Sequence, residues 1–174
     1  MGKQYKALKE EHIDFIREQK LFFVASCGGA EVNLSPKGYD TLRVTDSNTA
    51  VYLDYPGSGD RTARDIEAQG SVTIVFTSFT EKAGIIRLFA KGELVEKDDA
   101  RFGGYIRLFD IQDTGPVRRI ILYHITAVES SCGESVPFYE YLGERETLRG
   151  WAVKMHDKGK LPGYIKDHRV PPEL

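Results

Sequence analysis

Short β-favouring segments separated by tight turns follow one another along most of the chain, and they are rich in Val, Ile, Phe, Tyr and Thr. No such segment is followed at once by a long helix in the regular alternation that a doubly wound parallel sheet needs. The pattern therefore predicts a mainly β fold, an antiparallel barrel with a few short helices inserted. The predicted strands occupy residues 21–27, 31–35, 39–45, 50–55, 71–78, 85–96 and 117–128.

The last of these segments, residues 117–128, is apolar on both of its alternating faces. Ile120 and Leu122 share one face, and Ile121, Tyr123 and Ile125 share the other. A strand of this kind must be covered on both sides. We therefore expect it to form a barrel wall that also meets a helix or a second subunit.

Helical signals are few and short. In the first of them, His12, Phe15 and Ile16 share one face with charges opposite, which predicts an amphipathic helix lying over the sheet. A later helix is expected to end at Gly70, a residue type that favours the C-terminal cap. The predicted helices occupy residues 8–19, 61–69, 98–109 and 142–155.

One domain is expected to account for residues 1–174, with the barrel at about 20–130 and a helical and irregular extension at about 131–174. The hydrophobic fraction of 41% and the charged fraction of 29% are ordinary for a globular protein. A net charge of −2 gives no general attraction to nucleic acid. The sequence shows neither a bilayer-spanning apolar run nor a basic-then-apolar leader, so no membrane partner is expected.

The cysteines and histidines suggest no metal site. Cys27 and Cys132 form neither a CxxC motif nor a disulfide framework, so a reduced cytoplasmic setting is expected, with Cys27 in the core. The four histidines are widely separated and match no metal-ligand spacing, and His124 is expected to be a buried wall residue. Because the chain also lacks a GxSxG elbow and a Walker motif, it offers no catalytic residue by pattern.

The loop PGSGDRTAR, residues 56–64, is the clearest candidate for binding an anion. Gly57 and Gly59 can adopt backbone conformations that expose N–H groups. Asp60 is a plausible N-cap for the helix that follows. A glycine-containing loop that leads into a helix N-terminus is a natural phosphate site, because free N–H groups and the helix dipole point at the same place.

Side chains of the same loop add further donors. Ser58 and Thr62 supply hydroxyl groups, and Arg61 and Arg64 supply charge-assisted donors. An ordinary strand-to-helix turn with surface arginines is the alternative, since short glycine loops are common.

The NLSPKG stretch, residues 33–38, precedes this loop and is interpreted as a second polar site. Pro36 cannot donate to a strand ladder, so the backbone there is expected to leave the sheet as a turn with free polar groups. Asn33 and Ser35 could then recognise the edge of a planar heterocycle. An ordinary hairpin turn is the alternative.

Four stretches in order, LFFVASCGGAEVNLSPKG, VYLDYPGSGDRTARDI, SVTIVF and LFAKGELVE, resemble the pyridoxamine 5′-phosphate oxidase-like family of split-barrel flavoproteins. The resemblance covers residues 21–128, and the later stretch GERETLRGWA is similar to one group of uncharacterised members. It implies an antiparallel split β-barrel of the FMN-binding type. It also implies a homodimer with FMN at the subunit interface.

The resemblance also assigns site residues. The turn would face the isoalloxazine ring, the loop would hold the phosphate, Lys91 would lie near the same pocket, and the extension would close the site from the partner subunit. The ring residues are Asn33, Leu34, Ser35, Pro36 and Lys37; the phosphate residues are Ser58, Gly59, Arg61, Thr62 and Arg64; the closing residues are Arg149 and Trp151.

The C-terminal stretch KDHRVPPEL departs from the vitamin B6 oxidases, which carry an Arg- and His-rich substrate motif there. The resemblance therefore implies an FMN-dependent oxidoreductase with a different, unidentified small-molecule substrate. The alternatives are a flavin- or haem-binding protein that stores or senses its ligand, and a reductase that uses the deazaflavin F420 on the same fold.

Overall fold

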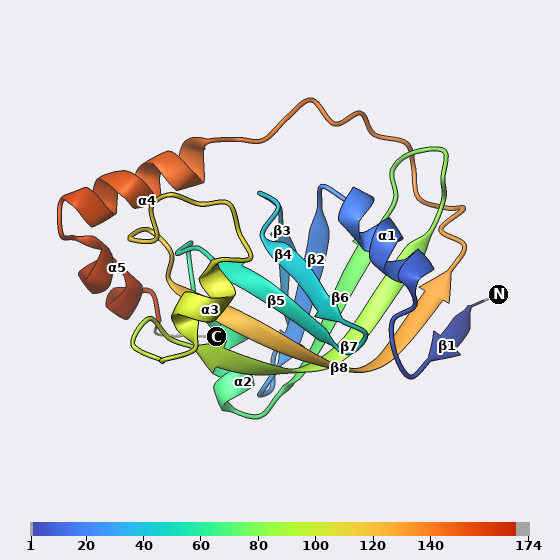
Figure 1. Ribbon diagram of the computed structural model, residues 1–174, viewed down its shortest axis with the longest axis horizontal. Coiled ribbons are helices and arrows are strands. Elements are labelled where there is room, and N and C mark those ends of the chain that lie inside the picture. The colour runs from blue at the N-terminus through green and yellow to red at the C-terminus, as the bar shows by residue number, and fades with distance from the viewer. Residues whose placement is uncertain (1, 170–174) are drawn as a thin grey trace.

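The computed structural model describes residues 2–169 as one curved antiparallel sheet with short helices around it (Figure 1). In this part of the chain the eight strands are β1 Lys3–Tyr5, β2 Phe22–Cys27, β3 Asn33–Lys37, β4 Leu42–Asp46, β5 Thr49–Asp54, β6 Ser71–Thr77, β7 Ile85–Val95 and β8 Arg119–Ser131. They run in the order β3-β2-β6-β7-β8-β5-β4, and β1 pairs with β8. The predicted mainly β antiparallel fold is confirmed. Strands β3 and β4 remain the two open edges of the sheet.

The helices are α1 Glu10–Glu18, α2 Arg61–Glu67, α3 Phe102–Ile106, α4 Thr147–Asp157 and α5 Leu161–Asp167. The helix predicted over residues 98–109 is wrong in length, because Gly103 and Gly104 weaken it and the Asp99 carboxylate instead caps a turn at the Arg101 N–H. Helix α5 and strand β1 were not predicted. None of the helices within residues 2–169 is long and apolar enough to cross a bilayer.

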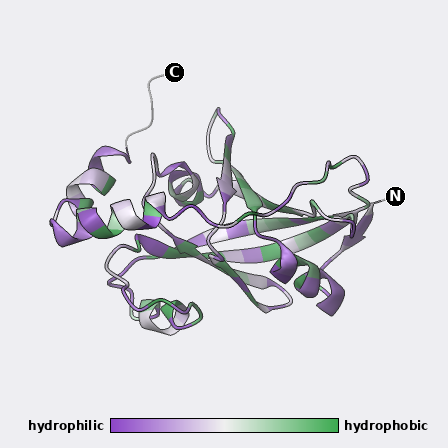
Figure 2. Ribbon diagram, turned by 90° about the horizontal axis from the view of Figure 1, so that it is seen from above, coloured by the Kyte–Doolittle hydropathy of each residue, from purple (hydrophilic) through white to green (hydrophobic). Residues whose placement is uncertain are grey.

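Two apolar clusters hold the sheet, and Figure 2 shows the hydrophobic residues concentrated along the strands. The larger cluster brings Phe15 and Ile16 of α1 together with buried residues of β2, β5, β6, β7 and β8. The smaller cluster lies on the opposite face of β5 and β8 and is covered by Phe102 of α3. Strand β8 contributes Ile121 and Tyr123 to the first cluster and Ile120 to the second, so the prediction of a wall covered on both faces is confirmed.

Helix α2 packs closely on β2, β6 and β7 because three glycines leave room for it. A Cβ on Gly28 or Gly70 would lie 2.6 or 2.7 Å from backbone atoms of Asp65, and one on Gly92 would lie 2.4 Å from Ile66. Gly70 does not take the positive φ of a C-terminal cap as predicted; Gln69 does, with φ of 60°. The Gly70 N–H donates to the Asp65 carbonyl at 2.8 Å and closes the helix.

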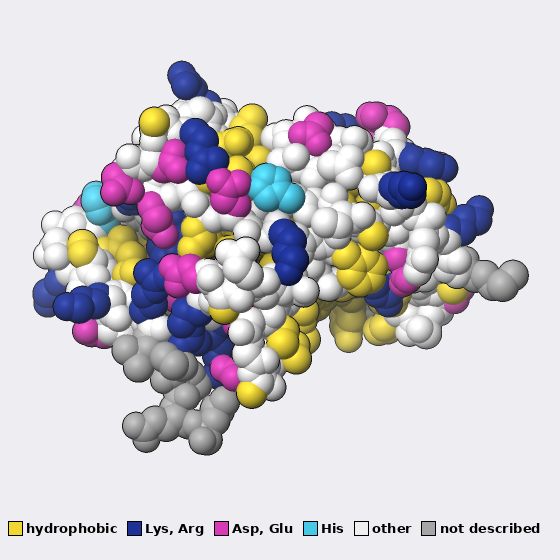
Figure 3. Space-filling view, turned by 90° about the horizontal axis from the view of Figure 1, so that it is seen from below, with side chains coloured by type: hydrophobic (Ala, Val, Ile, Leu, Met, Phe, Trp, Pro, Cys, Tyr) yellow, Lys and Arg dark blue, Asp and Glu magenta, His cyan; other side chains and the backbone are white. Residues whose placement is uncertain are grey.

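Cys27 and His124 are both exposed, so the predicted burial of these two residues is wrong. Side chains alternate along a strand, and each of the two follows a buried residue, Ser26 and Tyr123 respectively. The His124 ring instead pairs with Glu93 at 2.8 Å on the outer face of β7 and β8. Acidic and basic side chains are interspersed over the face shown in Figure 3.

His12 is buried in α1, and it should make the stability sensitive to acid. Its Nδ1 accepts the Lys9 N–H at 3.2 Å, and burial lowers the pKa of the ring, with Glu11 opposing this and Lys9 adding to it. Because the folded pKa lies below the unfolded value of 6.5, the unfolded chain binds the proton first. Stability should be unaffected well above pH 6.5 and should fall as the pH drops from there towards the folded pKa.

Urea unfolding at pH 7.5 and 5.5 tests this expectation on the wild type and on His12→Gln. The wild type should lose more free energy of unfolding between these pH values than His12→Gln does. Equal losses in the two proteins would show that His12 does not carry the effect.

Candidate functional site

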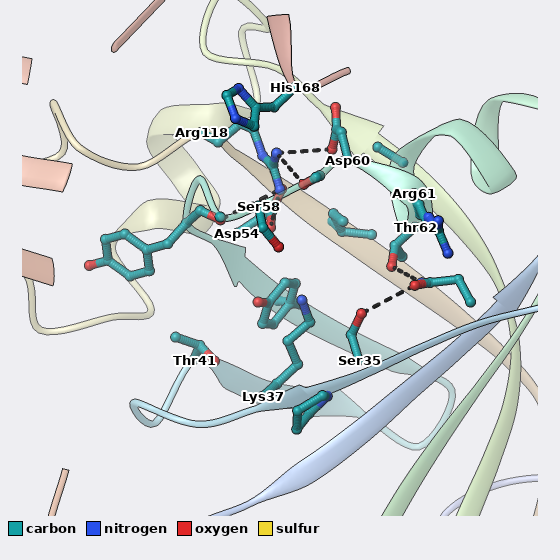
Figure 4. Close-up of a pocket in the computed structure, with 18 of the residues that line it drawn as sticks. Ser35, Lys37, Thr41, Asp54, Ser58, Asp60, Arg61, Thr62, Arg118 and His168 are labelled. Atoms are coloured by element: carbon teal, nitrogen blue, oxygen red, sulfur yellow. Dashed lines mark hydrogen bonds and ion pairs between the residues drawn. The ribbon is translucent and has the colours of Figure 1, made fainter. Parts of the chain in front are cut away.

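A cavity of about 830 Å³ opens between β3, the loop of residues 55–60, the start of α2 and the end of α5 (Figure 4). It gathers ten of the thirteen residues that the sequence assigned to a cofactor. Those ten are Asn33, Leu34, Ser35, Pro36, Lys37, Ser58, Gly59, Arg61, Thr62 and Arg64. Figure 4 shows Ser35 and Lys37 on one side of the cavity, with Ser58 and Asp60 facing them from the other.

The strand predicted over residues 31–35 is present from Asn33, but it continues through Pro36 and Lys37, where a turn was predicted. Residues Asn33–Lys37 form β3, paired antiparallel with β2, and Pro36 lies opposite Phe23. Proline is tolerated because β3 is an edge strand, so its missing N–H need not reach a neighbour. The strand thus presents one polar and partly exposed edge to the cavity.

A directed chain of hydrogen bonds joins β3 to α2. The Asp65 carboxylate only accepts, so the Ser26 hydroxyl donates to it at 2.6 Å. The Ser26 oxygen then accepts from Asn33 Nδ2 at 3.0 Å, and the same Nδ2 donates to Thr62 Oγ1 at 3.0 Å. Ser35 completes the chain by donating to Asn33 Oδ1 at 3.3 Å. Thr62 Oγ1 accepts here and donates to no group within residues 2–169, so its own hydrogen is available to a ligand in the cavity.

The glycines of the loop do not act as predicted. Neither Gly57 nor Gly59 has a positive φ, and a Cβ on either would meet no atom within 4 Å. The open space beside them is part of the cavity. These positions therefore allow a ligand to approach the backbone closely, which is the second use of glycine.

Asp60 occupies the N-cap position of α2, but its side chain makes no capping hydrogen bond. The carboxylate turns away to Arg119, whose Nη1 lies 3.0 Å from both of its oxygens. The first N–H groups of α2 have no intrahelical acceptor. They are therefore available to an outside acceptor at the loop.

The two predicted arginines differ. Among residues 2–169 the Arg61 guanidinium forms no hydrogen bond or ion pair and stays free to bind an anion. Arg64 Nη1 instead donates to the Arg169 carbonyl at 3.2 Å, and this bond joins α2 to the segment that follows α5. Ser58 is exposed at the loop tip.

The buried Tyr52 and Tyr123 line the cavity together with the half-buried Lys37. Burial lowers the pKa of Lys37, and the nearby Asp54 partly opposes this shift. Burial raises the pKa of both Tyr52 and Tyr123, so both phenols stay neutral donors. The Tyr123 hydroxyl is buried and has no hydrogen-bond partner within the described chain.

Three predicted residues lie outside the cavity lining. Lys91 Nζ donates to the Gln69 carbonyl at 2.9 Å and caps the C-terminus of α2. Arg149 donates to the Tyr39 carbonyl at 2.7 Å, and Trp151 packs edge-on against Tyr164. The extension nevertheless reaches the cavity of its own chain.

Several residues that line the cavity were not predicted from the sequence. Leu148 and His168 bring the extension to the cavity wall, and Figure 4 shows the His168 ring beside Arg118. His168 Nδ1 donates to the Tyr164 carbonyl at 2.9 Å, and the ring stacks on that tyrosine. The ion pairs of Arg118 with Asp54 and Asp60 could not be predicted from the sequence, because 58 or more residues separate the arginine from its partners.

The model of the family described as pyridoxamine 5′-phosphate oxidase matches residues 8–132, which hold the strands from β2 to β8 and the loop of residues 56–64. The chain belongs to the pyridoxamine 5′-phosphate oxidase family. The family membership predicted from its motifs is confirmed. A curated relative, the pyridoxamine 5′-phosphate oxidase family protein ustO of Aspergillus flavus, is 33% identical over 176 residues, which cover 92% of this chain and 71% of ustO.

Solved structures of low identity share the fold of the family. A putative pyridoxamine 5′-phosphate oxidase from Lactobacillus delbrueckii superposes with a TM-score of 0.58 at 18% identity, covering 71% of this chain and 94% of that one. An FAD-binding protein from Mycobacterium smegmatis superposes with a TM-score of 0.52 at 8% identity, covering 73% and 97% of the two chains. Both superpositions support the split-barrel type of fold.

Proposed function

We propose that this family member binds FMN and acts as an FMN-dependent oxidoreductase on a small molecule. The observation that carries the proposal is a pair of donors at one end of the cavity, the Arg61 guanidinium and the Thr62 hydroxyl, which have no acceptor among the described residues. A phosphate dianion needs convergent charged and hydroxyl donors of this kind. The open backbone beside Gly57 and Gly59 leaves room for it.

The other end of the cavity suits a flat, partly polar ring. Strand β3 offers its backbone edge and the Ser35 hydroxyl, while Tyr52 and Tyr123 line the cavity. The Asn33 bonds to Ser26 and Thr62 hold β3 and α2 at a fixed separation, so ring and phosphate sites keep one spacing. Bound FMN would supply hydride or electron transfer, and the chain supplies placement, hydrogen bonds and control of solvent access.

A homodimer is part of the proposal, because the cavity is bordered by an exposed apolar edge. Leu34 lines the cavity on β3 and is 65% exposed, and Val32 beside it is 69% exposed. A second copy of the chain that packed over β3 would bury both residues and narrow the opening.

Purification tests both parts directly. The protein should be yellow, should release FMN on denaturation, and should show twice the 19.6 kDa chain mass by light scattering. Mass spectrometry of the extracted ligand separates FMN from F420 and haem. A colourless protein that takes up no added FMN would refute the proposal, and bound FMN with no turnover of any donor would favour the storage or sensing alternative.

Arg61→Ala should weaken FMN binding by about 1.5–3 kcal/mol, the usual loss for a hydrogen bond to a charged group. The free protein should keep its stability, since Arg61 has no partner among residues 2–169. Fluorescence titration measures the affinity, with Arg107→Ala, an exposed arginine beyond α3, as the control. Unchanged affinity in Arg61→Ala would mean that the phosphate lies elsewhere.

A further inference from the structure

Arg118, the residue before β8, is fixed to the end of β5 by three bonds. Its Nε and Nη2 contact the Asp54 carboxylate at 2.8 and 3.1 Å, and its backbone N–H donates to the Asp54 carbonyl at 2.8 Å. The side chain is 8% exposed and lines the cavity. A bidentate pair of this kind gives the guanidinium one orientation.

The same guanidinium holds both ends of the loop of residues 55–60. Nη1 donates to the Gly59 carbonyl at 3.1 Å and lies 3.2 Å from Asp60 Oδ1, and Nη2 faces the Tyr55 carbonyl at 3.5 Å. The Arg118 side chain thus makes four hydrogen bonds, to Asp54, Gly59 and Tyr55, and its Nη1 also lies within ion-pair distance of Asp60. Because the protein engages these donors, we expect Arg118 to act on binding through the loop.

Peptide geometry shows what this bonding does. In a trans peptide the C=O and N–H point in opposite directions, so fixing the Gly59 carbonyl also fixes the N–H of Asp60. That peptide leads directly into α2 at Arg61. The position of Arg118 therefore sets the orientation of the Asp60 N–H, directly beside Arg61 and Thr62.

The charges that line the cavity also indicate a role for Arg118. Asp54 and Asp60 are each 3% exposed and line the cavity, where two unpaired carboxylates would repel a phosphate. Arg118 contacts both of them, and Arg119 contacts Asp60. With these charges neutralised, Arg61 remains at the phosphate end as a cation that pairs with no acid within residues 2–169.

We propose that Arg118 is a positioning residue that makes the site select a phosphorylated flavin over its unphosphorylated form. The inference rests on the proposed function, because it concerns the phosphate end of that site. Arg118 does so by locking the loop of residues 55–60 and neutralising its carboxylates, without touching the phosphate.

Arg118→Met and Arg118→Lys test the proposal with FMN and riboflavin, which differ only in the phosphate. Both variants should bind FMN about 10- to 100-fold more weakly and riboflavin within about threefold of wild type. Lysine keeps the charge but cannot make the bidentate and carbonyl bonds together. Hydrogen exchange of residues 55–64 in the ligand-free protein should be faster in both variants. Arg87→Met, which removes an ion pair with Glu129 outside the cavity, is the matched control.

An equal loss of FMN and riboflavin affinity would overturn the proposal, because a general structural defect moves both. Full FMN preference in Arg118→Lys would also overturn it, since charge alone would then suffice. Wild-type protein that binds neither flavin would refute the proposed function and the selectivity with it. Unchanged hydrogen exchange of the loop in both variants would refute the claim that Arg118 holds the loop, whatever the affinities. Arg118→Lys keeps the test decisive if Arg118→Met does not fold.

Discussion

Replacing Asp60 with Asn is expected to lower the free energy of unfolding by about 3–5 kcal/mol, because it breaks a buried ion pair from one side. Asp60 and Arg119 are 3% and 2% exposed, and three contacts of 3.0 Å join them. Without the carboxylate, the acid that still pairs with Arg119 in the described part of the chain is Glu96, which is itself 46% exposed. The variant leaves a buried cation that lacks most of its compensation.

Asp40→Asn provides the matched control, since Asp40 pairs with Arg43 at 2.8 Å but is 82% exposed. Its loss should change the free energy of unfolding by less than about 1 kcal/mol. Urea unfolding of the three proteins at one pH and salt concentration gives the comparison. If Asp60→Asn cost no more than Asp40→Asn, the buried network would contribute little to stability.

The sequence predicted the fold well where the information is local. Runs such as residues 71–77 and 119–128 are β-favouring along their whole length, and tight turns separate them. The loop of residues 56–64 was also recognised from its own composition, and ten of the thirteen assigned residues line one cavity. Whether these ten bind a cofactor stays a prediction.

Errors arose where distant residues decide the local structure. Asp60 has the chemistry of a cap, yet Arg119 draws its carboxylate away across 59 residues. Pro36 suggests a turn, yet it lies in a strand because β3 is at the edge of the sheet. Likewise, Lys91 was assigned to the pocket, but α2 ends beside it, and the Lys91 amine donates to the Gln69 carbonyl just after that helix.

The second large effect is expected at Gly70, where Gly70→Ala should cost about 3 kcal/mol of stability, at the upper end of overpacking. The new Cβ would lie 2.3 Å from the Cys27 carbonyl oxygen and 2.7 Å from the Asp65 carbonyl oxygen. Both are backbone atoms, one in β2 and one in α2, so no flexible side chain can give way. The helix must shift away from the sheet.

That shift has a functional consequence, because α2 carries Arg61 and Thr62. Moving α2 off β2 would stretch the bonds from Asn33 to Thr62 and from Ser26 to Asp65, so FMN affinity should fall together with stability. Gly57→Ala is the control: its Cβ has open space, and its stability should stay within about 0.5 kcal/mol of wild type. Normal unfolding and normal FMN binding in Gly70→Ala would show that close packing of α2 does not hold the two ends of the site together.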